Sequence, residues 1–247
     1  MKNFGGWAIY GLILGGVILL LSVGTYHRNE RWRSDLELWK DCVKKSPRKE
    51  RPHHNLGFAY YELGQWDEAK REFEEALQLN PHYALSMYNL GLVFYQKGLT
   101  DKAIHWYQRA LEIDSTITDS YYNLGLAYHK KGDFVKAIEA YCTFLEVKPD
   151  YKNAHLNLGL AYQRLKEWDK AIQSFQKEFK YHPENVYPHV YLGEIYMEMG
   201  LVPEALIHFR KALETPHLSG ADRIRKWVQS IEKEKGKWES QQGTNTK

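Results

Sequence analysis

The sequence has few cysteines, almost no net charge and no catalytic signature. Cys42 and Cys142 lie far apart in the chain, so we expect them to pack as small apolar side chains rather than to form a disulfide. A formal net charge of +3 in 247 residues does not provide the long basic stripe that general nucleic-acid binding needs. Phosphate-binding glycine loops, nucleophile elbows and H-x-x-x-H or C-x-x-C metal pairs are missing. We therefore expect no enzyme, no cofactor, no metal and no nucleic-acid partner.

What the sequence does contain is an internal repeat of 34 residues, marked by five glycines. These are Gly57, Gly91, Gly125, Gly159 and Gly193. With the glycine at position 8, every unit has leucine at position 7, an aromatic residue at positions 11 and 24 and alanine at position 20, and three units have proline at position 32. Positions 4, 7, 8 and 11 share one side of a helix, whereas positions 2, 6, 9 and 13 lie almost opposite. Each unit must therefore stack on its neighbours to bury its apolar side.

This pattern resembles the tetratricopeptide repeat, a helix-turn-helix unit with small residues between its paired helices. The resemblance implies an all-α fold, a right-handed α-solenoid of about five and a half tetratricopeptide repeats. The composition of the N-terminal segment predicts a single transmembrane helix before it. The predicted parts are a transmembrane anchor (1–27), a linker with an N-terminal half-repeat capping helix (28–49), five repeats (50–83, 84–117, 118–151, 152–185 and 186–217), a C-terminal capping helix (218–238) and a disordered tail (239–247).

The predicted anchor rests on residues 3–26, which contain no Asp, Glu, Lys or Arg. About 20 helical residues suffice to cross the hydrocarbon layer of a bilayer. A cleaved signal peptide is the alternative, because Lys2 precedes the apolar run and small residues follow it. Gly11 and Gly15 form a small-xxx-small pair through which two anchors could associate, so a homo-oligomer stays open.

The orientation of the anchor is predicted differently by two observations. Arg28, Arg31 and Arg33 follow the span, so the positive-inside rule favours a cytoplasmic repeat region. The segment 27–57, however, resembles the junction between membrane helix and repeats in membrane glycosyltransferases of the protein O-mannosyltransferase type. The residues that carry this resemblance are Arg28-Asn29, Trp32, Leu38-Trp39, Ser46-Pro47 and Asn55-Leu56-Gly57. It does not extend to the multi-span catalytic part of such enzymes, and it implies an extracytoplasmic repeat region, which we favour.

Candidate binding residues lie on the side of the first helices that is free of packing positions. Position 6 is asparagine in four successive units, and such a row can pair with the backbone of an extended peptide; it resembles the asparagine ladder of the O-linked N-acetylglucosamine transferase. The alternative is local hydrogen bonding between helices. Apolar and aromatic side chains surround the row in the first half of the array, and basic side chains follow in the second half. The predicted peptide-binding groove comprises Asn55, Asn89, Asn123, Asn157, His54, Phe58, Tyr61, Tyr88, Leu92, Tyr95, Tyr122, Leu126, Lys130 and Arg164.

These residues predict a partner segment with hydrophobic anchors at one end and acidic groups toward the other. The alternative for some of the aromatic residues is packing between units. Histidines at position 4 of three units, His53, His155 and His189, are expected to be packing residues rather than metal ligands.

Three departures from the repeat pattern predict local changes of shape. Phe144 and Glu178 stand at position 27, where other units have alanine, and Lys166 replaces a turn glycine. A phenylalanine there must push helices apart or turn outward, which predicts altered curvature nearby. We expect Glu178 to be exposed, because a buried carboxylate needs a partner.

The sequence as a whole predicts a membrane-anchored protein–protein interaction scaffold that binds an extended peptide segment. The alternative function is an accessory module that presents acceptor proteins to a membrane glycosyltransferase. The identity of the partner does not follow from the sequence.

Overall fold

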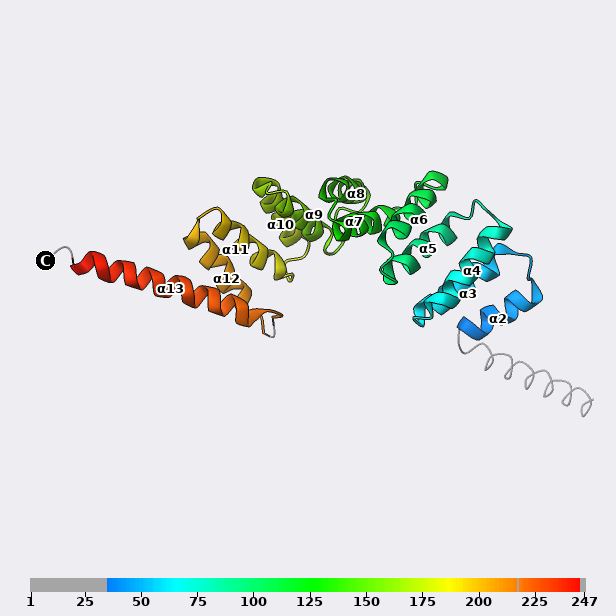
Figure 1. The fold of residues 1–247 in the computed structure, drawn as a ribbon, viewed down its shortest axis with the longest axis horizontal. Coiled ribbons are helices and arrows are strands. Elements are labelled where there is room, and N and C mark those ends of the chain that lie inside the picture. Colours follow the sequence, from blue (N-terminus) through cyan, green and yellow to red (C-terminus); the bar gives the residue numbers. More distant parts are fainter. Residues whose placement is uncertain (1–34, 217, 245–247) are drawn as a thin grey trace, which may run out of the picture. The chain divides into compact units, whose positions relative to one another are not determined.

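The computed structural model describes residues 35–216 and 218–244, and these form twelve α-helices (Figure 1). They divide into two units at Ser115 and Thr116. Within each unit, successive helices pair as hairpins. The predicted anchor lies outside the described residues. Among the helices that are described, none is both long and apolar enough to cross a membrane.

The first unit holds one single helix and two helical hairpins. Its helices are α2 (Asp35–Lys45), α3 (Glu50–Glu62), α4 (Trp66–Leu79), α5 (Ala84–Gln96) and α6 (Thr100–Ile113). Helix α2 packs on α3, α3 pairs with α4, and α5 pairs with α6. The expected lone helix before the first full repeat is thus present.

The second unit holds three hairpins and a long final helix. Its helices are α7 (Asp119–Lys131), α8 (Phe134–Val147), α9 (Ala154–Arg164), α10 (Trp168–Tyr181), α11 (Tyr187–Glu198), α12 (Val202–Leu213) and α13 (Ala221–Thr244). Buried Ile224 and Val228 of α13 join Phe209 and Val190 in one apolar cluster, so α13 covers the last hairpin as expected. It runs to Thr244, past the predicted end at residue 238, so the expectation of a disordered tail from residue 239 was wrong for residues 239–244.

The repeated glycine allows the two helices of a hairpin to approach closely. A Cβ added at Gly125 would lie 2.3 Å from Cε1 of Tyr141, and one added at Gly91 would lie 2.4 Å from Cε1 of Tyr107. Both tyrosines are fully buried and stand at position 24. The aromatic ring of the second helix therefore occupies the space that a larger residue at position 8 would need.

The turns inside the hairpins need a residue with a left-handed backbone. Gly132 ends α7 with a φ of 86°, and the next helix begins after Asp133, whose carboxylate accepts a hydrogen bond from the backbone N–H of Lys136 at 3.2 Å. In the fourth hairpin Lys166 occupies the equivalent position with a φ of 59°. The turn is thus kept without glycine, and the lysine carries the steric cost of this conformation.

The two unusual residues at position 27 are both buried. Phe144 is 0% exposed and packs edge-on against Tyr151 at 5.0 Å between ring centroids, so it does not turn outward. Glu178 is also 0% exposed, and the expectation that it would be exposed was wrong. Its carboxylate accepts hydrogen bonds from the backbone N–H groups of Asn153 (3.0 Å) and Leu156 (3.2 Å) at the start of α9. The partner that a buried carboxylate requires is a helix N-terminus.

Candidate functional site

The first unit exposes an aromatic surface on its first helices, α3 and α5. Phe58 of α3 is 45% exposed, and its ring stacks on Tyr61 at a centroid distance of 6.5 Å. Gln96 at the end of α5 donates a hydrogen bond from Nε2 to the hydroxyl of Tyr61 at 3.4 Å, which joins the two helices. Leu92 and Tyr95 of α5 are half-buried. Four of the predicted groove residues therefore lie on two adjacent helices with part of their apolar surface open to solvent.

A cavity of about 280 Å³ lies beside this surface, between α2 and α3. Its lining residues are Asp35, Leu36, Trp39, Asn55, Phe58, Ala59, Glu62 and Leu63. The predicted groove residues Asn55 and Phe58 thus meet Trp39 of the half-repeat helix. From the sequence, that helix was expected only to cap the first repeat.

Two predicted groove residues of the first unit are packing residues. His54 is buried between the rings of Phe73 and Tyr83, and its Nδ1 lies 3.0 Å from the hydroxyl of Ser86. Burial lowers the pKa of His54 to about 4, so the imidazole is neutral at physiological pH. The half-buried Tyr88 lies against fully buried Tyr107 at 5.9 Å between ring centroids. These contacts agree with the packing alternative for the aromatic and imidazole rings.

In the second unit Tyr122 is also mainly a packing residue. Its ring contacts Phe144 and Tyr151 at 5.1 and 5.0 Å, and its hydroxyl accepts a hydrogen bond from Nδ2 of Asn157 at 3.0 Å. Leu126 is half-buried. Exposed basic side chains are contributed by Lys130 and by Arg164, whose guanidinium lies 5.9 Å from the ring centroid of Phe134.

The four asparagines at position 6 have different environments. Asn89 is buried, whereas Asn55 is half-buried. Asn123 donates from Nδ2 to the carbonyl of Asp119 at 3.0 Å, and Asn157 donates to Tyr122 of the preceding hairpin. A primary amide has two N–H donors and one carbonyl acceptor, so one amide can bond both within the protein and to a peptide. Both the structural role and a contact with a peptide are compatible with this geometry.

The three histidines at position 4 pack as expected. Nδ1 of His53 lies 2.8 Å from Oε2 of Glu72, Nε2 of His155 lies 3.0 Å from the carbonyl of Pro149, and Nδ1 of His189 lies 2.8 Å from Nδ1 of His208. Over the described part of the chain, no three His, Cys, Asp or Glu side chains group as a metal site. Cys42 and Cys142 are free thiols.

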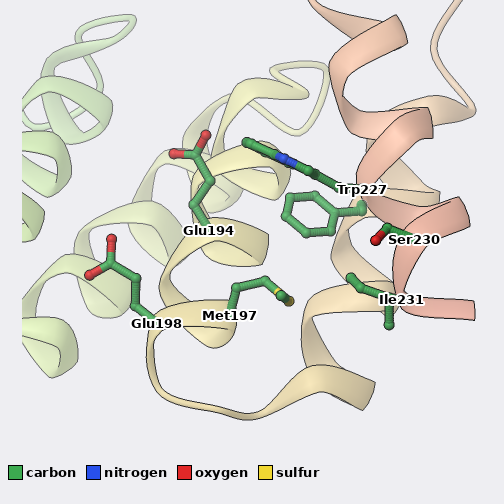
Figure 2. A pocket seen from close by; sticks show the side chains of 7 residues that line it. Glu194, Met197, Glu198, Trp227, Ser230 and Ile231 are labelled. Atoms are coloured by element: carbon green, nitrogen blue, oxygen red, sulfur yellow. The ribbon is translucent and has the colours of Figure 1, made fainter. Parts of the chain in front are cut away.

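A second cavity, in the second unit, was not predicted from the sequence. It has a volume of about 420 Å³ and lies where α11, α12 and α13 meet. Its lining residues are Glu194, Met197, Glu198, Phe209, Trp227, Ser230 and Ile231. Figure 2 shows that one helix contributes Glu194, Met197 and Glu198, and that Trp227, Ser230 and Ile231 come from the facing helix. The sequence did contain a signal for it, because Trp227 lies one repeat length after Gly193, at the position where the five repeats have glycine.

Repeated helical hairpins with glycine-mediated contacts define a class of protein, the α-helical repeat proteins that bind partners on exposed helix faces. Four family models specify the class further. They describe tetratricopeptide or TPR repeats and match residues 49–116, 127–166, 106–139 and 156–218.

Comparisons with solved structures agree with these models. A crystal structure of MamA is 30% identical and matches over 64% of this chain and 93% of its own, with a TM-score of 0.62. A MamA structure from Desulfovibrio magneticus RS-1 is 22% identical, covers 67% of this chain and 93% of its own, and has a TM-score of 0.64. YrrB, described as a TPR protein with an unusual peptide-binding site, is 19% identical over 77% of this chain and 99% of its own, with a TM-score of 0.70. A comparison with curated protein sequences gave no significant match.

The chain therefore belongs to the tetratricopeptide repeat family. As a member of this family it is a non-enzymatic scaffold for protein–protein interaction.

Proposed function

We propose that this chain binds an extended segment of a partner protein along the first helices of its hairpins. The observation that carries this proposal is the partly exposed surface that the aromatic residues Phe58, Tyr61 and Tyr95 form with Leu92 on α3 and α5. Aromatic side chains bury large areas at low entropic cost and act as anchors in many interfaces. The hairpins hold these side chains in place before binding, which lowers the ordering cost of association. YrrB, which shares the fold, is described as having an unusual peptide-binding site, and this supports peptide binding as the function of the array.

A selection experiment tests this proposal. The full chain, kept in dodecyl maltoside micelles, is used to select from a displayed library of random dodecapeptides, and the affinity of the enriched peptides is measured by fluorescence anisotropy. Phe58→Ala should weaken binding about tenfold, because it removes a half-exposed aromatic anchor worth roughly 1–2 kcal/mol. Leu79→Ala is the matched control, since Leu79 is an exposed apolar residue at the end of α4. Equal affinity for both variants and the wild type would refute binding at this surface.

The chain is further proposed to be anchored in a membrane by residues 3–26, with its repeats on the extracytoplasmic side. The uncharged apolar composition of that segment and the junction resemblance of residues 27–57 support this. A reporter fused after Lys247 tests the orientation, and the mass of the product tests whether the segment is retained. A reporter on the cytoplasmic face would contradict the proposed orientation, and a shortened product would indicate a cleaved signal peptide.

The same junction resemblance favours a second candidate function, presentation of acceptor proteins to a membrane glycosyltransferase. Co-purification of a multi-span transferase with the detergent-extracted chain is the expected result for this candidate. If transferase activity on a bound acceptor does not change when the chain is deleted, the candidate is wrong.

A further inference from the structure

The cavity between α11, α12 and α13 has a feature that the regular hairpins lack. In each hairpin the glycine at position 8 accommodates the aromatic ring of the second helix. Helix α13 continues the repeat register as a first helix, but no later helix packs on it among the described residues. Trp227 therefore occupies the glycine position, with its indole 5.6 Å from the ring of Phe209 and 37% exposed. The result is a hollow with aromatic walls at the end of the second unit.

The opposite wall of this cavity is acidic. Glu194 and Glu198 both line it from α11, and Figure 2 shows Glu194 close to the indole of Trp227 and Glu198 farther from it on the same helix. The side chain of Glu194 is 24% exposed, and burial raises its pKa although Arg223 lies 3.5 Å away. Within the described chain no cation forms an ion pair with Glu198. The cavity therefore combines an apolar interior with two carboxylates, one paired with Arg223 and the other, Glu198, without an ion pair among the described residues.

An intramolecular contact indicates what kind of group such a wall attracts. The Arg223 guanidinium lies 5.0 Å from the centroid of the Trp227 indole and pairs with Glu194. A cation is thus already held between an aromatic face and a carboxylate at the edge of the cavity. Arg223 itself is largely exposed and does not line the cavity, so it leaves the interior and Glu198 available.

We propose that this cavity binds a lysine or arginine side chain from the partner segment. The aliphatic stem of that side chain packs on Met197, Ile231 and Trp227, and its charge lies between Glu194 and Glu198. A volume of about 420 Å³ accommodates one long side chain together with part of its neighbours. This inference rests on the proposed function, and it names the kind of side chain that the second unit recognises in the partner.

The test uses dodecapeptides selected in the same way that still bind the Phe58→Ala variant, together with a double-mutant cycle. One partner of the cycle is the full chain with Glu194→Gln and Glu198→Gln; the other is a selected peptide whose basic residue is replaced by citrulline or norleucine. Each change alone should weaken binding roughly tenfold, and the two together should weaken it little more than one of them. Glu204→Gln is the control variant, because Glu204 is an exposed carboxylate on α12 outside the cavity and should leave affinity unchanged.

The possible outcomes separate this inference from the proposed function. If the peptides that still bind Phe58→Ala have no required basic residue, or if the cycle gives additive effects, the basic anchor is wrong, whereas peptide binding at Phe58 stands. Failure to select any peptide would count against both. If the wild type self-associates in sedimentation experiments and the double variant does not, the occupant is a second copy of the chain and the proposal of a partner's basic side chain is wrong.

Discussion

The buried carboxylate of Glu178 is expected to stabilise the fourth hairpin by several kcal/mol. Oε1 accepts from the backbone N–H of Asn153 at 3.0 Å and from Nδ2 of Asn185 at 2.8 Å, and Oε2 accepts from the N–H of Leu156 at 3.2 Å. Asn185 also donates to the side-chain oxygen of Asn153 at 3.0 Å. One side chain of α10 thus accepts hydrogen bonds from two backbone N–H groups at the start of α9 that have no partner within that helix, and it also holds the loop that leads into α11.

The magnitude follows from two opposing effects. A hydrogen bond to a charged group contributes about 1.5–3 kcal/mol, and Glu178 accepts three of them. Burial of the carboxylate costs several kcal/mol in lost hydration. Glu178→Ala removes the acceptors and leaves three donors without a partner, so we expect a loss of about 3–5 kcal/mol. Glu178→Gln keeps one acceptor oxygen and should cost about 1–3 kcal/mol.

Hydrogen exchange of the full chain is the suitable assay, because repeat arrays open locally rather than in one transition. Amide protection over residues 153–160 should fall in the order wild type, Glu178→Gln, Glu178→Ala. Glu146→Ala is the control: Glu146 is an exposed glutamate on α8 and its loss should change stability by less than about 0.5 kcal/mol. If Glu178→Ala is as stable as the wild type or more stable, the desolvation cost exceeds the hydrogen bonding and this account of the buried carboxylate is wrong.

The hairpins were predictable from the sequence because each carries its own local signals. The glycine at position 8, the alanine at position 20 and the aromatic residue at position 24 describe a contact within one hairpin, such as that between Gly125 and Tyr141. Turn residues such as Gly132 fix where one helix ends. A contact between residues close in the chain and repeated five times leaves a periodic pattern that can be read without a structure.

The environment of Glu178 was not predictable in the same way. Its partners are mainly backbone N–H groups, and these carry no sequence signal. They are available because the first N–H groups of a helix have no partner within it, and Asn153, with a φ of 65°, directly precedes α9. Acidic side chains are mostly exposed, and the prediction that Glu178 is exposed followed this rule; it was wrong because these N–H groups bind the carboxylate. The asparagines at 153 and 185 were the only hint, since both amides share the network of Glu178.

The candidate sites, too, were only partly predictable from the sequence. Phe58 could be predicted to be exposed because position 9 lies away from the packed side of the helix. The packing roles of His54 and Tyr122 depend on partners from neighbouring hairpins, such as Ser86 and Asn157. The cavity at Trp227 depends on how α13 stacks on α12, and a helical pattern of apolar residues does not reveal a hollow. Contacts within one repeat unit were predictable from the sequence, whereas contacts and cavities between neighbouring units were not.

Two further predictions concern single residues. Lys166→Gly should stabilise the fourth hairpin by about 0.5–1 kcal/mol, because glycine relieves the steric cost of a φ of 59°, partly offset by its greater unfolded-state entropy; an unchanged or lower thermal midpoint would contradict this. The second concerns acid stability of the first unit through His54, whose pKa is lowered from 6.5 to about 4 in the folded state because its ring is buried. Above pH 6.5 the imidazole is neutral in both states, so its contribution to stability is complete. Between pH 6.5 and about 4 the unfolded chain binds a proton that the folded chain does not. The free energy of unfolding therefore decreases as the pH is lowered through this window, and it levels off below about pH 4. His54→Gln should therefore flatten the pH profile of hydrogen-exchange stability in α3 and α5 relative to the wild type, and an unchanged slope in the variant would show that His54 is not the titrating group.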